Sequence, residues 1–288
     1  MKKKTINVII IIILIISAAF CAGMMIRQLV LHNTAGQVYE ELKEEVKTAS
    51  VPEETPSPEP EATEKPTVKP SMTPNPTEAA ASSSSSEEEK EPIEVPIDFE
   101  TLQKRNPDAY AWITIENTKV DYPILQGEDN SFYVHHDIDR NYNFAGCLFT
   151  EDYNSKDFED PMTVIYGHNM HNESMFGTLY YYTDMPGFFE NNKDITVYMP
   201  DKILHYRVFA AYQRDDEHLL HNRAYDNPSS FQLYLDSVLS LREIGAKIDR
   251  DIELDAETDK ILTLSTCVGD GSSGRRYLVQ AVLVSIEE

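Results

Sequence analysis

The chain has 288 residues, a length that allows one or two domains, and a formal net charge of −24 from 49 acidic and 25 basic residues. Nucleic-acid binding requires clustered lysine and arginine, so this charge argues against nucleic acid as a partner. An acidic balance of this kind is typical of a well-solvated protein surface.

The N-terminus carries a targeting segment. Lysines at positions 2–4 precede residues 8–26, which contain no charged side chain. This stretch is close to the ~20 residues that a helix needs to cross a membrane, and the preceding lysines favour a cytoplasmic N-terminus. A cleaved signal peptide is the alternative, with Ser17-Ala18-Ala19 as a possible processing site, but the apolar run continues past it. We therefore predict a basic tail and a single-pass membrane anchor in residues 1–31, with the rest of the chain extracellular.

Residues 32–96 are predicted to form a polar linker. Ten of the sixteen prolines lie between positions 50 and 96, and no aromatic residue occurs between Tyr39 and Phe99. Such a composition cannot bury enough apolar surface to offset the entropy of ordering, so we expect a disordered stalk. A short polar helix is expected over residues 35–47, where the chain leaves the membrane.

The remaining residues, 97–288, have the size of a single domain. A short helix is predicted over residues 99–104, ended by Asn106-Pro107. Eight segments that are rich in Val, Ile, Tyr and Phe, and are separated by turn residues, predict strands. These strands cover residues 110–115, 120–125, 147–150, 163–166, 195–199, 204–212, 260–266 and 277–286. The pattern predicts a mainly β fold, a barrel or a sandwich.

One stronger helix is predicted between the sixth and seventh strands. Asn227 is suited to cap it and Pro228 to its first turn. Apolar side chains recur at helical spacing at Phe231, Leu235, Val238 and Leu241. Gly245 is predicted to end the helix.

Three cysteines are too few for a disulfide framework. Cys21 lies in the predicted anchor, which leaves Cys147 and Cys267 outside the membrane. The two could pair in an external compartment, but a chain that can bury a core of its own does not require a disulfide. Cys147 lies between Gly146 and Leu148 and is predicted to be a core residue.

Cys267 ends a predicted strand and precedes a loop, a position at which a nucleophile is exposed and well placed. Taken alone, a free cysteine is more often a small buried side chain. A cysteine nucleophile also requires a proton partner, and His168 ends another predicted strand. An arginine beside the thiol, Arg275 or Arg276, would favour the thiolate and hold a developing oxyanion. Because neighbouring side chains in a strand point to opposite faces, only one of the two arginines can reach the thiol.

These stretches resemble the sortases, the surface transpeptidases of Gram-positive bacteria. The residues that carry the resemblance are Thr263-Leu264-Ser265-Thr266-Cys267 with Arg276, and Tyr166-Gly167-His168-Asn169-Met170 continuing through Met175-Phe176-Gly177. Asp121-Tyr122-Pro123-Ile124, Gln126-Gly127-Glu128-Asp129-Asn130 and the helix before the seventh strand resemble class B in particular. The resemblance extends from about Phe99 to the end of the chain.

The resemblance implies an eight-stranded β-barrel with an N-terminal helix and a long helix between strands six and seven. Cys267 would attack the carbonyl after a threonine in a sorting signal, His168 would protonate the leaving amine, and Arg276 would steady substrate and oxyanion. A cell-wall precursor or a pilin amine would then accept the acyl group. Arg276 is the arginine that the family pattern selects over Arg275.

The resemblance also implies substrate-binding positions at Asn130, Val134, Tyr166 and Ser265. No cofactor and no metal are expected, since the spacing of His135-His136-Asp137 fits no closed zinc site. Two other functions stay open: a surface cysteine protease, in which water takes the acyl group, and a catalytically silent binding domain on a stalk.

Overall fold

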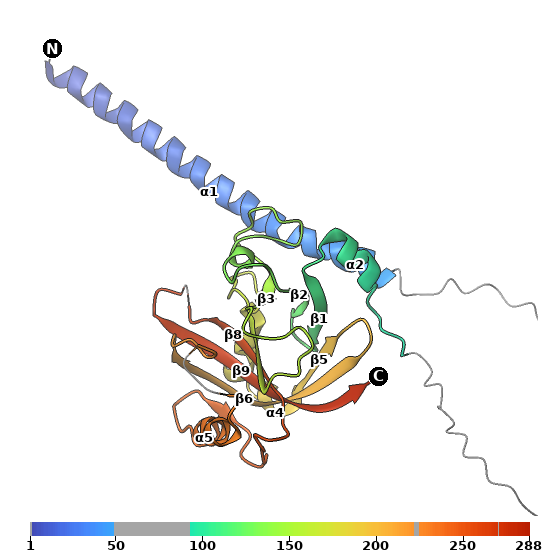
Figure 1. The fold of residues 1–288 in the computed structure, drawn as a ribbon. Helices are drawn as coiled ribbons and strands as arrows, with labels where there is room; N and C mark the ends of the chain where they lie inside the picture. Colours follow the sequence, from blue (N-terminus) through green and yellow to red (C-terminus); the bar gives the residue numbers. More distant parts are fainter. Residues whose placement is uncertain (1, 49–92, 222–224, 270) are drawn as a thin grey trace, which may run out of the picture.

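The computed structural model describes residues 2–48, 93–221, 225–269 and 271–288, and within its first helix the side chains of residues 13–25 and 36–47. The elements follow one another in the order α1 (Lys2–Thr48), α2 (Phe99–Arg105), β1 (Ala109–Ile115), β2 (Asp121–Leu125), η1 (Phe132–Val134), β3 (Leu148–Thr150), β4 (Met162–Tyr166), η2 (Gly177–Tyr180), α3 (Tyr181–Asp184), α4 (Phe188–Asn191), β5 (Asp194–Tyr198), β6 (Ile203–Asp215), α5 (Pro228–Leu239), β7 (Lys247–Ile248), β8 (Ile261–Cys267) and β9 (Arg275–Glu287). Figure 1 shows the strands gathered into one body, with α1 projecting away from it.

Eight of the strands close into a barrel. Their order is β5-β1-β2-β3-β4-β8-β9-β6, and pairing of β6 with β5 completes the ring, while the short β7 is attached to β6 outside it. The pairs β2–β3 and β4–β8 are parallel, and the other pairs are antiparallel. The predicted eight-stranded barrel is confirmed, and each of the eight predicted segments forms one of its strands.

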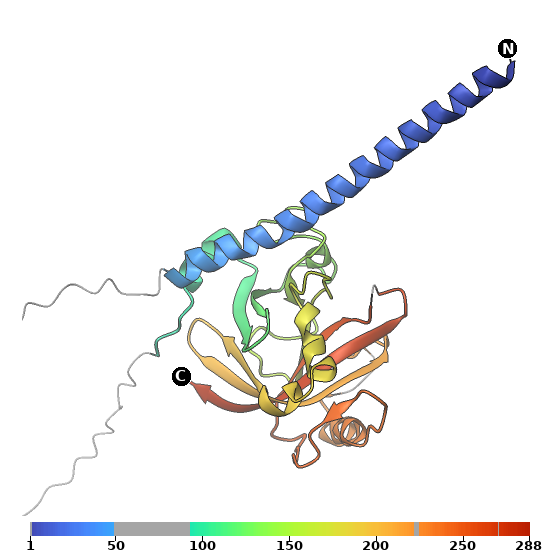
Figure 2. The same ribbon diagram turned by 180° about the vertical axis from the view of Figure 1, so that it is seen from behind.

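The strands beside α5 are buried on both faces. Neighbouring residues of β4 and β9 alternate between two apolar clusters: Val164 and Leu278 pack with α5, whereas Ile165 and Val279 pack inside the barrel. This alternation is the two-residue period of a strand. The two views of the ribbon place α5 against the outside of the barrel (Figures 1 and 2). The strands β4, β8 and β9 are therefore packed on both faces, which fixes the positions of their ends.

The helix α5 begins as predicted and ends earlier. The side chain of Asn227 accepts a hydrogen bond from the Ser230 N–H, and Pro228 is the first helical residue. The last residue is Leu239, so the prediction that Gly245 ends the helix is wrong. The misleading signal is Leu241, which lies in the following loop yet still packs against the same apolar cluster. The spacing of apolar residues therefore predicts which side chains are buried, but it does not identify the last residue of the helix.

The helix α2 agrees with its prediction to within one residue, with Asp98 capping it through the Thr101 N–H. The helix predicted over residues 35–47 is the last part of the much longer α1. It lies against the barrel and α2 because Tyr39, Leu42 and Val46 form an apolar stripe that is buried there (Figure 1). Residues 36–47 were assigned by the sequence to the polar linker, whereas here they are packed. Residues 49–92 of that linker lie outside the described residues.

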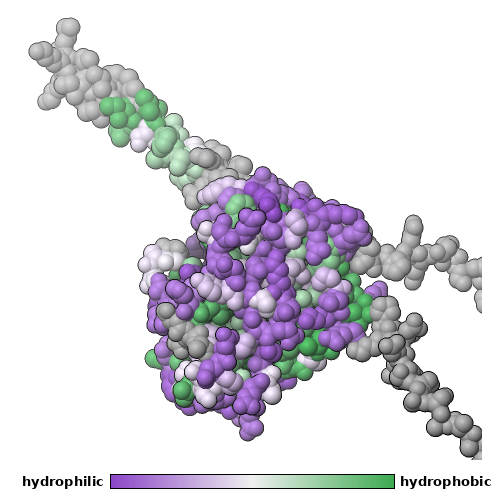
Figure 3. Space-filling model, in the orientation of Figure 1, coloured by the Kyte–Doolittle hydropathy of each residue, from purple (hydrophilic) through white to green (hydrophobic). Residues whose placement is uncertain are grey.

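The described N-terminal part of α1 is apolar and exposed. Ile13, Ile16 and Phe20 are each at least 60% exposed, in contrast to the largely hydrophilic surface of the barrel (Figure 3). Within the described parts of the chain, no helix combines the length and the apolar character needed to cross a membrane. The side chains of residues 8–12 and 26, which belong to the predicted anchor, lie outside the described ones.

Candidate active site

Strand register brings three of the predicted site residues together. The strands β4 and β8 are parallel, with Tyr166 opposite Ser265, so the chain continues from both ends in the same direction. His168 and Cys267 each lie two residues beyond this pair. The antiparallel pairing of β8 with β9 sets Cys267 directly opposite Arg276. Residues far apart in the sequence are thereby gathered at one edge of the barrel.

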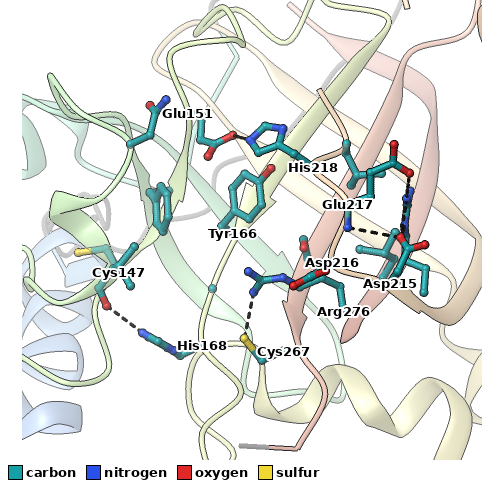
Figure 4. A pocket seen from close by; sticks show the side chains of 18 of the residues that line it. Cys147, Glu151, Tyr166, His168, Asp215, Asp216, Glu217, His218, Cys267 and Arg276 are labelled. Carbon is teal, nitrogen blue, oxygen red and sulfur yellow. Dashed lines mark hydrogen bonds and ion pairs between the residues drawn. The ribbon is translucent and has the colours of Figure 1, made fainter. Parts of the chain in front are cut away.

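The Arg276 guanidinium contacts the Cys267 thiol. Its Nη1 lies 2.9 Å from Sγ, within hydrogen-bonding distance (Figure 4). Arg275 points elsewhere: its side chain is about half exposed and its Nη2 lies 3.9 Å from a carboxylate oxygen of Glu243. Arg276, and not Arg275, therefore contacts the thiol in the structure, and its role in catalysis stays a prediction. The guanidinium places fixed donors where negative charge would develop in a reaction of this thiol.

The loop after Cys267 is held by contacts to its backbone. The Cys267 carbonyl accepts a hydrogen bond from the Tyr180 hydroxyl at 3.1 Å and one from the Asn169 side chain at 3.4 Å. Gly271 has a φ of +83°, which favours glycine, and a side chain there would begin 3.5 Å from the Cys267 sulfur. The thiol therefore lies between the backbone at Gly271 in the loop and the side chain of Arg276 on β9.

His168 is enclosed by aromatic side chains. Its ring stacks with those of His135 and Phe144, at centroid distances of 5.6 and 5.8 Å. Its Nε2 lies 2.8 Å from the carbonyl oxygen of Val134. Because a carbonyl oxygen only accepts hydrogen bonds, Nε2 carries the proton and Nδ1 is left with the lone pair.

Burial lowers the pKa of His168 below its usual range. The nearby His135 and Arg276 lower it further, because positive neighbours disfavour the imidazolium, while the hydrogen bond to the Val134 carbonyl raises it. The neutral imidazole is therefore the principal form at neutral pH. A neutral histidine can take up a proton when one is released beside it.

All seven predicted site residues line a single cavity of about 400 Å³. These are Asn130, Val134, Tyr166, His168, Ser265, Cys267 and Arg276. Their exposure differs: Ser265 is nearly fully buried, whereas Asn130 is anchored at the rim by two hydrogen bonds to Asp152. Val134 contributes its carbonyl to His168. The resemblance thus selected residues that the fold brings into one place.

The sequence did not predict the pair of polar side chains, Glu151 and His218, that lines the cavity on the far side of Tyr166 from Cys267 (Figure 4). There, His218 Nε2 lies 2.8 Å from Glu151 Oε2, and Glu151 is only 13% exposed. Burial and the adjacent Glu151 carboxylate raise the pKa of Tyr166, so its hydroxyl stays protonated. His135 and Phe144 were also missed as neighbours of His168. These four residues lie in loops or at strand ends, and no sequence pattern marks them.

Cys147 also borders the cavity but is only 1% exposed. Its sulfur lies 3.2 Å from the Tyr39 hydroxyl and 3.2 Å from the His136 carbonyl. Desolvation raises the pKa of its thiol far above the usual range. Cys147 is a core residue, as predicted, and all three cysteines are free. Among the described residues, no group of three His, Cys, Asp or Glu side chains is arranged to hold a metal ion.

Comparison with known proteins agrees with this geometry. The sortase-domain family profile matches residues 113–284. Sortase B of Listeria monocytogenes is 33% identical over 202 residues, covering 67% of this chain and 76% of that protein. The crystal structure of Clostridium perfringens sortase B is 30% identical, with a TM-score of 0.55, and covers 65% of this chain and 100% of that chain.

A structure of Staphylococcus aureus sortase B in complex with a substrate is 29% identical to this chain. Its TM-score is 0.57, and the match covers 65% of this chain and 84% of that chain. Residues 113–284, which the family profile matches, include all seven predicted site residues, from Asn130 to Arg276. The chain therefore belongs to the sortase family of cysteine transpeptidases, and within it to class B.

Proposed function

We propose that this chain is a surface transpeptidase that cleaves a sorting signal after threonine and transfers the acyl group to an amine. The observation that carries the proposal is the 2.9 Å contact between Arg276 and the Cys267 thiol, in a cavity that also contains His168. Staphylococcus aureus sortase B has been solved in complex with its substrate, which supports a sorting-signal substrate for this chain as well. A cell-wall precursor or a pilin lysine would supply the amine.

In the first half-reaction the Cys267 thiolate attacks the peptide carbonyl carbon. The carbonyl oxygen becomes an oxyanion, to which the guanidinium of Arg276 turns its remaining donors. When the tetrahedral adduct collapses, the peptide C–N bond breaks and a thioester to Cys267 remains. The leaving amine receives its proton from His168, which held the proton of the thiol; Nδ1 serves this transfer because Nε2 is bound to Val134.

In the second half-reaction an amine replaces the departed peptide. It attacks the thioester carbonyl and loses a proton to His168 Nδ1, and the Cys267 thiolate leaves. One peptide bond has been exchanged for another, so neither a cofactor nor water enters the balance. Asn130, Tyr166 and Ser265 line the same cavity and would contact the sorting peptide, and the carbonyl of Val134 would hold the histidine in place.

The domain boundaries follow the same proposal. Residues 1–31 would be a cytoplasmic tail and signal anchor, and residues 97–288 the catalytic domain outside the cell. Residues 32–96 would connect the two as a polar linker, except that residues 36–47 pack on the domain as the end of α1. The uncharged run at residues 8–26 after three lysines supports the anchor. Protease added to cells stripped of their wall should digest the domain and spare the N-terminal tail. Protection of the domain would overturn this topology.

The transfer itself is tested with a library of sorting peptides and the purified chain. Products are analysed by mass spectrometry with and without an added amine, such as a lysine or oligoglycine peptide. A transpeptidase joins the peptide acyl part to the amine. Hydrolysis that continues unchanged in the presence of amine would instead identify a cysteine protease, and failure to trap Cys267 with any thiol-reactive peptide would identify a silent binding domain.

A further inference from the structure

The C-terminal end of α1 contacts the wall of the cavity. Tyr39 is 2% exposed, and its hydroxyl donates a hydrogen bond of 2.6 Å to the carbonyl of Gly146. Burial raises the pKa of Tyr39 well above its ordinary value, so this hydroxyl remains a donor at every relevant pH. One side chain of α1 thus holds the segment that precedes β3.

That segment is packed directly on the carbonyl that binds His168. Gly146 has a φ of +59°, and a side-chain carbon at this position would lie 2.5 Å from the carbonyl oxygens of Tyr133 and Val134. The next residue, Cys147, donates its N–H to the Tyr133 carbonyl at 2.9 Å. A shift of Gly146 would therefore move the Val134 oxygen, which accepts the hydrogen bond from His168 Nε2.

The end of α1 is itself firmly attached to the domain. Leu42 and Val46 are fully buried, and the Val46 carbonyl accepts a 3.0 Å hydrogen bond from the N–H of Asp98 at the start of α2. The Lys47 ammonium lies 2.7 Å from the Asp121 carboxylate. Exposed ion pairs contribute little, so the buried apolar stripe provides most of the attachment.

We propose that Tyr39 is a positioning residue for His168, acting through Gly146 and the carbonyl of Val134. The last turns of α1 then belong to the catalytic unit, although the linker separates them from the barrel in sequence. This inference rests on the role of His168 in the proposed function. A purely structural role for Tyr39 would affect stability and leave the protonation of His168 unchanged.

The variant Tyr39→Phe tests the proposal, because it removes one oxygen and keeps the ring. In the full chain, purified in detergent, we expect kcat/KM to fall about two- to tenfold, the range expected for one lost hydrogen bond. We also expect the acid limb of the pH profile, which follows the protonation of His168, to move to lower pH. The Val134 hydrogen bond raises the pKa of His168, so loosening it lowers that pKa.

Val46→Ala is the matched control, since Val46 lies on the same buried stripe and the hydrogen bond between Tyr39 and Gly146 does not involve it. It should lower the melting temperature and leave the pH profile in place. An unchanged kcat/KM and pH profile in Tyr39→Phe would overturn the inference, as would an equal pH shift in Val46→Ala. Full activity of His168→Ala would instead overturn the proposed function, so the two failures are distinguishable.

Discussion

Two cysteines border the same cavity, but they differ in the exposure of the side chain and in the groups that surround the sulfur. Cys267 ends β8, is partly exposed, and has a guanidinium 2.9 Å from its sulfur. Cys147 precedes β3 and is 1% exposed, and among the described residues the groups within hydrogen-bonding distance of its sulfur are the Tyr39 hydroxyl and the His136 carbonyl. The thiolate is the nucleophile, so a cationic neighbour and an exposed sulfur determine which cysteine reacts. A position at the edge of the cavity is not sufficient.

The largest expected effect tests this difference directly. Cys267→Ala should abolish both cleavage and transfer, because no other group can form the thioester. Cys147→Ala should retain turnover and show a lower melting temperature, since it removes a buried sulfur from a packed site. Both variants are compared by peptide turnover and thermal unfolding. Loss of turnover in a folded Cys147→Ala chain, or a disulfide between the two cysteines in mass spectra, would reverse the assignment.

His168→Ala separates the reactivity of the thiol from the proton transfer. We expect turnover to fall by about 10²–10⁴, the usual contribution of general acid–base catalysis. Alkylation of Cys267 by iodoacetamide should continue, because Arg276 remains beside the sulfur. Peptide turnover and the rate of alkylation, followed by mass spectrometry, check the two halves of this prediction. Equal losses in both would show that His168, and not the guanidinium, maintains the reactive thiol.

Arg276→Ala should reduce kcat/KM by about 10²–10³, as expected for the loss of a donor to a developing oxyanion. Arg276→Lys should also be impaired, because a point charge does not replace a planar fork of donors. Arg275→Ala is the matched control from the neighbouring position and should remain near wild type, since solvated charges contribute little. Steady-state kinetics of the three variants measure which arginine contributes to kcat/KM. A greater loss in folded Arg275→Ala than in Arg276→Ala would contradict the geometry.

The strands could be predicted from the sequence because each has a local signal of β-branched and aromatic residues. Their pairing could not, because the parallel contact of β4 with β8 depends on how β5, β6 and α5 fold between them. The two-residue β7 is too short to show a pattern. The position of α1 was missed for another reason: Tyr39, Leu42 and Val46 are spaced as one helical face, but the Pro-rich run that follows suggested a linker from residue 32 onward.

Cys267, His168 and an arginine at position 275 or 276 were predicted from the residues themselves, whereas the resemblance selected Arg276 and added the four substrate-binding positions. The structure brings all seven residues into one cavity, and their roles stay predictions. The surroundings of the site could not be read from the chain. Glu151 and His218 meet only because the loop after β6 folds across the end of β3, and Phe144 reaches His168 only because its own loop folds back. Such contacts belong to loops, whose paths follow from the whole fold and not from local spacing.

The smallest expected effect concerns the charge around His168. The ring of His135 stacks on it at 5.6 Å and is one of the groups that lower its pKa, after burial. His135→Gln removes one of the groups that lower the pKa of His168, so that pKa should rise, and it should stay below its usual range because the ring remains buried. The acid limb of the pH profile should therefore move to higher pH, opposite in sign to the shift expected for Tyr39→Phe.

NMR titration of histidine-labelled protein measures this shift directly, with the exposed His171→Gln variant as the control that should leave His168 unchanged. The two signs together separate the effects of two consecutive residues: the Val134 carbonyl favours the imidazolium through a hydrogen bond, and the stacked ring of His135 disfavours it. Movement of the His168 titration to lower pH in His135→Gln would contradict this prediction, because the loss of a group that disfavours the imidazolium and the entry of water would both raise the pKa of His168.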